Sequence, residues 1–257
     1  MRVCSSDNRY NMKRTVRHIT LIAIFLVACT AGVQAQHYFG MRGGYGTGSA
    51  RLEPERGFEN ESVGGMLSGG VGWKYYSSEA FVGGVAADML YMQQGFRTVT
   101  RNYETGDRVT GYERHVNTVM MPICWQPHVY MPGQRLRVFL NAGVTFSYVL
   151  DSTETDITYV DGVQTARVTR PYTMTLTRDN RFGYGLCGGG GMSWSAGRLE
   201  IFGEARFYLG YSDILKNRNK NETNPHMRSP LDGLQLSAGV FWRLGSGGIK
   251  SAQGRRN

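Results

Sequence analysis

Apolar and polar residues alternate along most of the chain from residue 36 onward. The alternation is clearest in Arg135–Leu150, where every even-numbered residue is apolar, whereas the odd-numbered positions include Arg137 and Asn141. Side chains that point alternately to opposite faces repeat with a period of two, which is the geometry of a β-strand. We therefore expect a strand here with one apolar face and one largely polar face.

The stretch Ala80–Arg97 shows the same period, with Phe81, Val85 and Met89 on one face and Asp88 in the middle of the other. A soluble sheet would turn this carboxylate to water and the apolar face to a core. A membrane barrel would turn the apolar face to lipid and the polar face to its lumen. One strand does not distinguish these two arrangements, so the number of strands and their connections must decide.

Eight stretches carry the alternation: Tyr38–Ser49, Ser62–Tyr76, Ala80–Arg97, Thr118–Tyr130, Arg135–Leu150, Arg181–Ser195, Arg198–Ser212 and Asp232–Leu244. Short turns alternate with long polar connections, the latter being Arg51–Glu61, Thr98–Asn117, Asp151–Asn180 and Asp213–Pro230. An even strand number with short periplasmic turns and long outer loops is typical of bacterial outer-membrane barrels. The pattern predicts an all-β, eight-stranded antiparallel up-and-down transmembrane β-barrel.

Two local signals refine this prediction. Asp161-Gly162 lies between two β-prone runs and favours a two-residue hairpin turn, so that two of the long loops could prolong the strands as hairpins. Pro122 and Pro127 fall inside the fourth stretch, although proline lacks the N–H that a closed sheet requires. We interpret Pro127 as a bulge or as the periplasmic end of that strand.

Three short motifs carry a family resemblance. ADMLYMQQGF (Ala87–Phe96), Met121-Pro122 and GEARFYLGYSDI (Gly203–Ile214) resemble, in this order, motifs of the Bacteroidota PorT-like outer-membrane β-barrel family, with Asp88 where that family usually has glutamate. The resemblance covers roughly the whole chain after its leader. It implies a small barrel in the outer membrane but no single activity, and it suggests an accessory role in type IX protein secretion.

The first 35 residues read as a secretory signal peptide, with a possible later start at Met12. A basic segment precedes the short apolar run Ile19–Cys29, and small residues before Gln36 offer a cleavage site after Ala35. A membrane anchor and a lipidated Cys29 are the alternatives. We expect residues 36–245 to form the barrel and residues 246–257 a flexible basic tail, with export by the general secretory pathway to the outer membrane of a Gram-negative cell.

The chain carries a net charge of +9, but its leader holds five of the 29 basic residues and one of the 20 acidic residues. The remainder is therefore only mildly and diffusely basic, which does not suggest a nucleic-acid partner. We expect contact with outer-membrane lipid and lipopolysaccharide, with the barrel-assembly machinery during insertion, and with an extracellular or secretion-system protein. No phosphate-binding loop, zinc-ligand spacing or nucleotide motif points to a cofactor.

Two cysteines follow the expected cleavage site. Cys124 and Cys187 are assigned to the fourth and sixth strands, both pointing inward with one strand between them. Strand spacing then places their backbones about 9–10 Å apart, beyond the roughly 7 Å that a disulfide tolerates. We expect two free, buried thiols.

Six charged side chains should point into the lumen: Arg42, Lys74, Asp88, Arg137, Glu204 and Arg206. Eight strands leave an interior just wide enough for side chains, so these charges should pair and serve as a structural plug rather than as a narrow ion path. We expect no catalytic, cofactor or metal site, and a scaffold that presents its outer loops for binding. A lipid-modifying enzyme using rim residues such as Ser229 and His226, and a soluble periplasmic barrel with the opposite facing, are the alternatives.

Overall fold

The computed structural model describes residues 36–52, 58–76, 83–133, 135–216 and 228–244. They form ten strands: β1 (Gln36–Ala50), β2 (Glu59–Tyr76), β3 (Gly84–Arg101), β4 (Arg108–Gln126), β5 (His128–Tyr130), β6 (Leu136–Val160), β7 (Val163–Pro171), β8 (Phe182–Ala196), β9 (Leu199–Asp213) and β10 (Pro230–Leu244). The expected signal peptide and basic tail lie outside the described residues.

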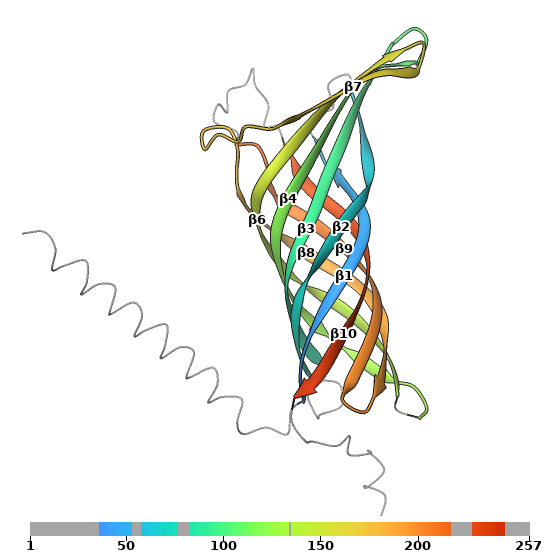
Figure 1. Cartoon of the computed structure of the whole chain (residues 1–257), viewed down its shortest axis with the longest axis vertical. Helices are drawn as coiled ribbons and strands as arrows, with labels where there is room; N and C mark the ends of the chain where they lie inside the picture. Colours follow the sequence, from blue (N-terminus) through green and yellow to red (C-terminus); the bar gives the residue numbers. More distant parts are fainter. Residues whose placement is uncertain (1–35, 53–57, 77–82, 134, 217–227, 245–257) are drawn as a thin grey trace, which may run out of the picture.

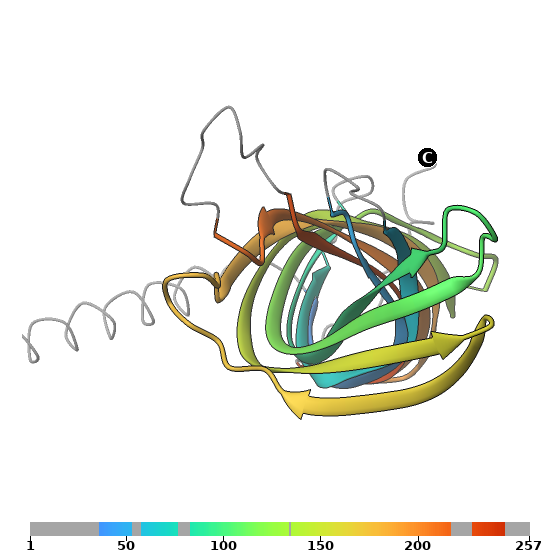
Figure 2. The same ribbon diagram turned by 90° about the horizontal axis from the view of Figure 1, so that it is seen from above.

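Eight of these strands close a barrel. These are β1, β2, β3, β4, β6, β8, β9 and β10. Each pairs antiparallel with the next of these eight along the chain, and β1 pairs with β10 to complete the ring (Figures 1 and 2). The short strand β5 continues β4 after Pro127 and pairs with β6, while β7 pairs with β6 outside the ring. The predicted eight-stranded up-and-down barrel is confirmed, and Pro127 lies at the break between β4 and β5. No helix in the described part of the chain is long and apolar enough to span a membrane.

The faces of the strands are arranged as expected for a barrel in lipid. On the outside, Leu140 is 63% exposed and Leu236 is 61% exposed, whereas Asp88 on the inside is 3% exposed. Aromatic residues border the outer apolar band, with Tyr91 and Tyr148 toward the end where β6 joins β7, and Trp73, Trp194 and Trp242 toward the end where β1 begins and β10 finishes. The apolar face is therefore turned outward and the polar face inward.

The strands on one side of the barrel extend beyond the alternating stretches of the sequence. The expectation that two of the long connections prolong the strands as hairpins is confirmed, because β3, β4 and β6 continue beyond the apolar band and β7 is added. The turn between β6 and β7 is the one signalled by Asp161-Gly162, whose φ angles of 51° and 74° suit a two-residue hairpin. We call this projection of β3, β4, β6 and β7 the tip sheet; it rises at the top of Figure 1.

Candidate functional site

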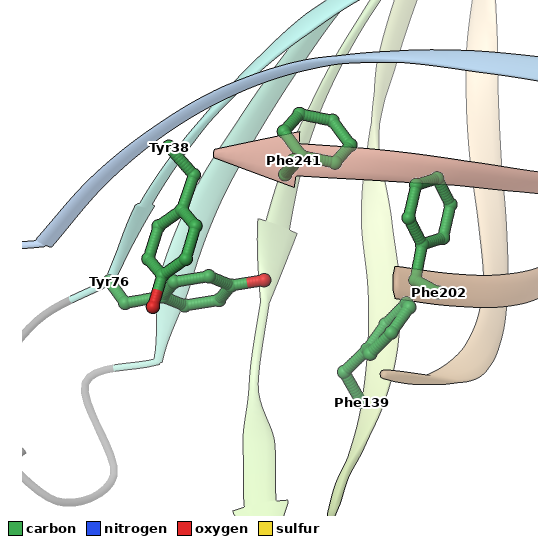
Figure 3. Packing of buried hydrophobic residues seen from close by; sticks show 5 residues of the cluster. All are labelled: Tyr38, Tyr76, Phe139, Phe202 and Phe241. Carbon is green, nitrogen blue, oxygen red and sulfur yellow. The ribbon is translucent and has the colours of Figure 1, made fainter. Parts of the chain in front are cut away.

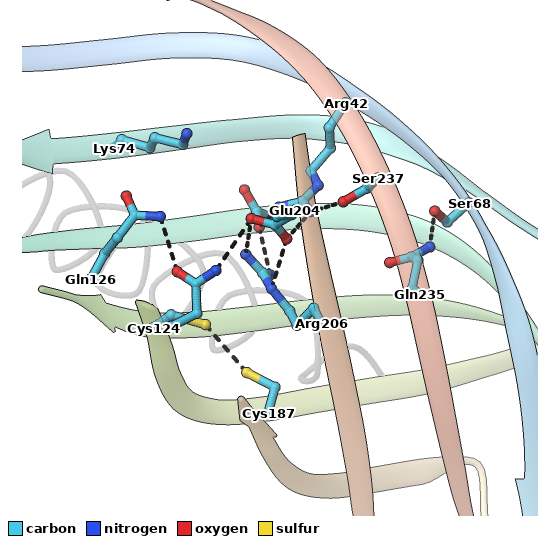
Figure 4. A network of polar contacts seen from close by, with 12 residues as sticks. Arg42, Ser68, Lys74, Cys124, Gln126, Cys187, Glu204, Arg206, Gln235 and Ser237 are labelled. Carbon is cyan, nitrogen blue, oxygen red and sulfur yellow. Dashed lines mark hydrogen bonds and ion pairs between the residues drawn. The ribbon is translucent and has the colours of Figure 1, made fainter. Parts of the chain in front are cut away.

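Four of the six predicted lumenal charges meet in the middle of the barrel (Figure 4). Asp88 on β3 accepts hydrogen bonds from Arg42 Nη1 at 2.7 Å and from Arg206 Nη1 at 3.0 Å. Glu204 on β9 pairs with both arginines. Two guanidinium groups thus face two carboxylates, and each charge has partners of opposite sign on other strands. Such pairing is what a buried charge requires to avoid a large desolvation cost.

Lys74 and Arg137 lie closer to the end opposite the tip sheet and pair with a carboxylate outside the predicted set. Glu200 on β9 lies 3.0 Å from Lys74 Nζ, through Oε1, and its Oε2 accepts a hydrogen bond from Arg137. The Lys74 ammonium also lies 4.0 Å from the Phe202 ring centre. The register of β9 could have identified Glu200, because it shares the inward face with Glu204 and Arg206.

Neutral side chains connect the two charged groups. The Tyr76 hydroxyl donates to Gln126 Oε1 at 2.7 Å, and Gln126 Nε2 donates to Asn141 Oδ1 at 2.9 Å. Asn141 Nδ2 in turn donates to Glu204 Oε2 at 3.2 Å. A continuous polar network therefore crosses the lumen and ties β2, β4, β6 and β9 together through their side chains.

Apolar side chains fill the lumen at both ends of this network. Toward the end opposite the tip sheet, five aromatic residues pack together, namely Tyr38, Tyr76, Phe139, Phe202 and Phe241 (Figure 3). Toward the tip sheet, Val116, Val149 and Ile214 form a second buried cluster. A cavity of about 40 Å³ remains near Gln94 and Thr145, which is room for a few water molecules. Packed side chains thus occupy the lumen on both sides of the charged network.

The two cysteines are buried and free, as predicted, but their sulfur atoms are in contact. Cys124 Sγ lies 3.2 Å from Cys187 Sγ. The strand between them contributes Gly143, which pairs with both cysteines and has no side chain to separate the thiols. Strand spacing alone misses this contact because inward-pointing side chains converge toward the axis of a narrow barrel.

A cluster of charged side chains covers the outer face of the tip sheet just beyond the apolar band. Glu113 on β4 accepts hydrogen bonds from Arg97 Nε at 2.9 Å and from Arg167 Nη2 at 3.2 Å, and it contacts His115 Nε2. The partners come from β3, β4 and β7, so this one carboxylate joins three strands. No alternation of apolar and polar residues signals this cluster, because its members lie beyond the lipid-facing part of the strands.

The ionisation of Glu113 gives the tip sheet a pH dependence. Burial raises the pKa of Glu113, but the hydrogen bonds from Arg97 and His115 outweigh this effect, so that the pKa falls below its ordinary value of 4.5. A carboxyl group whose pKa is lowered by folding stabilises the folded state above its unfolded pKa, and this contribution is lost as the pH falls through the folded pKa. The tip sheet should therefore loosen in acid below pH 4.5.

We expect Glu113→Gln to destabilise the tip sheet at neutral pH by about 1–3 kcal/mol, because a neutral amide replaces the buried, charged acceptor of these hydrogen bonds. Backbone NMR signals of residues 97–113, followed from pH 7 to pH 3 in micelles, would show the loosening at neutral pH in this variant. The exposed turn residue Glu104 is the matched control, and Glu104→Gln should behave as the parent protein does. An unchanged tip sheet in Glu113→Gln would show that this carboxylate does not hold the strands together.

Ser229 and His226 are the two rim residues considered for a lipid-modifying enzyme. Ser229 is buried, and its hydroxyl accepts a hydrogen bond from the Leu215 amide at 3.1 Å. His226 lies outside the described residues. Within the described residues, no group of three His, Cys, Asp or Glu side chains is arranged to hold a metal ion.

Comparison with solved structures finds barrels of low sequence identity. Ail from Yersinia pestis, crystallised with sucrose octasulfate, is 8% identical with a TM-score of 0.36, over 81% of this chain and 99% of that chain. OprG from Pseudomonas aeruginosa is 11% identical with a TM-score of 0.40, over 83% and 100%. Neisserial surface protein A is 11% identical with a TM-score of 0.38, over 82% and 99%. A search of the curated proteins gives no match.

The assignment comes from a family model. The model described as "Outer membrane protein beta-barrel domain" matches residues 33–216, which is most of the chain and includes β1 to β9. The closed antiparallel ring and its outward apolar band agree with this match. The chain belongs to the family of outer membrane protein β-barrel domains.

Proposed function

We propose that this protein is a non-enzymatic scaffold in the outer membrane that presents its tip sheet to a partner outside the cell. The observation that carries this proposal is the contrast between the two parts of the molecule. The lumen is filled by paired charges and packed aromatic rings, which fits a rigid support. The tip sheet projects beyond the apolar band, and its strand β7 is exposed along its whole length, which fits a binding element.

The proposal predicts that the tip sheet is reachable from outside intact cells. Thr105 lies exposed in the turn between β3 and β4, and Ala196 lies exposed at the opposite end of the barrel. A membrane-impermeant maleimide should label Thr105→Cys strongly on intact cells and should label Ala196→Cys only after the outer membrane is opened. The parent protein is a built-in control, because both of its described thiols are buried.

Labelling of Ala196→Cys instead of Thr105→Cys on intact cells would reverse the orientation and end this proposal. Equal labelling of both variants in a soluble periplasmic fraction would favour the alternative of a soluble barrel. Gel mobility with and without boiling should accompany the labelling, since a folded outer-membrane barrel changes its mobility on heating.

A finer proposal rests on the resemblance to the PorT-like barrels, namely an accessory role in type IX protein secretion. The motifs that suggest it lie in β3, β4 and β9, where Asp88, Glu204 and Arg206 form part of the lumenal network. Deletion of the gene should then reduce the secretion of type IX cargo at least several-fold, as measured in the culture medium. Normal secretion would leave the scaffold proposal standing and remove this role.

A further inference from the structure

Strand β7 is an unpaired edge of the tip sheet. Among the described strands it pairs with β6 alone, whereas each barrel strand has a neighbour on both sides. All nine of its residues are exposed. An edge strand presents a row of free backbone N–H and C=O groups to which another extended chain can pair.

The hydrogen bonding to β6 identifies which of these groups are free. The Tyr172 amide donates to the Ser152 carbonyl at 2.9 Å, and the same register pairs Arg170 with Glu154 and Val168 with Asp156. In an antiparallel ladder, alternate residues direct both backbone groups to the same neighbour. Even-numbered residues therefore face β6, and the backbone groups of Arg167 and Thr169 point away from it.

Proline at position 171 is consistent with this alternation. Pro171 is odd-numbered, so its missing N–H lies on the free edge, which is where a sheet tolerates proline. The free edge thus offers two N–H donors, at Arg167 and Thr169, and the carbonyl groups of the same residues. A short strand added at this edge would pair with the backbone groups of these two residues.

The side chains of β7 indicate the chemistry of such a strand. The sequence VQTARVTRP contains two arginines and no acidic residue. On its paired side, β7 lies against the acidic, threonine-rich upper part of β6, where Arg170 binds Glu154 at 2.5 Å and Asp156 at 3.0 Å. Arg167 and Arg170 are still about half exposed. Opposite charges on neighbouring strands stabilise pairing, and like charges weaken it.

We propose that the free edge of β7 binds an extended acidic segment of a partner protein, which adds a strand to the tip sheet. This inference rests on the proposed function and names the partner chemistry for it. A second copy of β7 is a poorer occupant, because it would bring two more arginines to the same edge. A segment resembling the upper part of β6 has the required charge and strand propensity.

The probe is a labelled peptide with the sequence of residues 151–160, DSTETDITYV, capped at both ends. Its binding to the purified barrel in lipid nanodiscs would be followed by fluorescence anisotropy. Thr169→Pro removes one outward N–H and leaves the ladder to β6 intact, so it should weaken binding at least about fivefold, the equivalent of one hydrogen bond. Thr169→Ala also loses the hydroxyl contact with Thr155 but retains the N–H, so it should bind within about twofold of the parent protein.

A peptide with lysine in place of its acidic residues should bind less tightly than the acidic peptide, and added salt should narrow the difference. The inference is overturned if the parent protein fails to bind the acidic peptide, if Thr169→Pro binds it as the parent does, or if crosslinking through β7 yields only dimers of this chain. If Thr105→Cys is labelled on intact cells but one of these results is found, the strand-addition site is ruled out and the scaffold proposal survives.

Discussion

Replacing Glu204 by leucine is expected to lower the free energy of unfolding of the barrel by about 3–5 kcal/mol, the cost of breaking a buried ion pair on one side. Glu204 pairs with Arg42 and Arg206 in the centre of the lumen. Without it, two buried guanidinium groups share a single carboxylate, Asp88. Urea unfolding in lipid vesicles, followed by tryptophan fluorescence and by gel mobility, would measure the loss.

The control is an ion pair of similar geometry at the surface. Glu154 binds Arg170 at 2.5 Å in the tip sheet, where the arginine is about half exposed. Glu154→Leu should therefore cost no more than about 1 kcal/mol, as for other solvated pairs. If Glu204→Leu also falls within 1 kcal/mol of the parent protein, the lumenal network is not a structural plug. An ion path would then become the better explanation for the paired charges within the lumen.

The alternation of residues predicts the strands only where lipid or a packed lumen distinguishes the two faces. Strand β6 is predicted from Arg135 to Leu150, because its outward residues must be apolar there. Beyond Leu150 the strand continues to Val160 with polar residues on both faces. Ion pairs between neighbouring strands, such as Arg97 with Glu113, hold that region together, and such pairs leave no periodic signal in a single sequence.

The sequence predicts which charged side chains point into the lumen, but it does not predict which of them pair. Each strand's own period places Asp88, Glu204 and Arg206 inside. Which cation meets which carboxylate depends on how far neighbouring strands are staggered, and that stagger is a property of the closed ring. The same reason explains why Glu200 was not assigned as the partner of Lys74, and why the contact between the two thiols was missed.

Because the apolar band faces outward, the cost of a charged substitution on its surface should depend on the depth of the residue in the bilayer. Val144 lies in the middle of the lipid-facing row of β6 and is 43% exposed, whereas Leu136 begins that row at the end opposite the tip sheet. An arginine at the midplane of a bilayer costs a barrel about 2–4 kcal/mol, but near the interface only about 0–1 kcal/mol. Val144→Arg should therefore destabilise the folded barrel strongly and Leu136→Arg only slightly.

The neighbouring residue provides the matched comparison for the opposite face. Thr145 is buried in the lumen, and Thr145→Val keeps its shape, so this variant should lose no more than about 1 kcal/mol through the hydroxyl group. Refolding into vesicles of known thickness would rank the three variants. A penalty that depends on depth requires lipid around the barrel, because a water-facing surface would accept arginine at either position. Equal and small penalties at Val144 and Leu136 would thus place the apolar band against something other than a membrane.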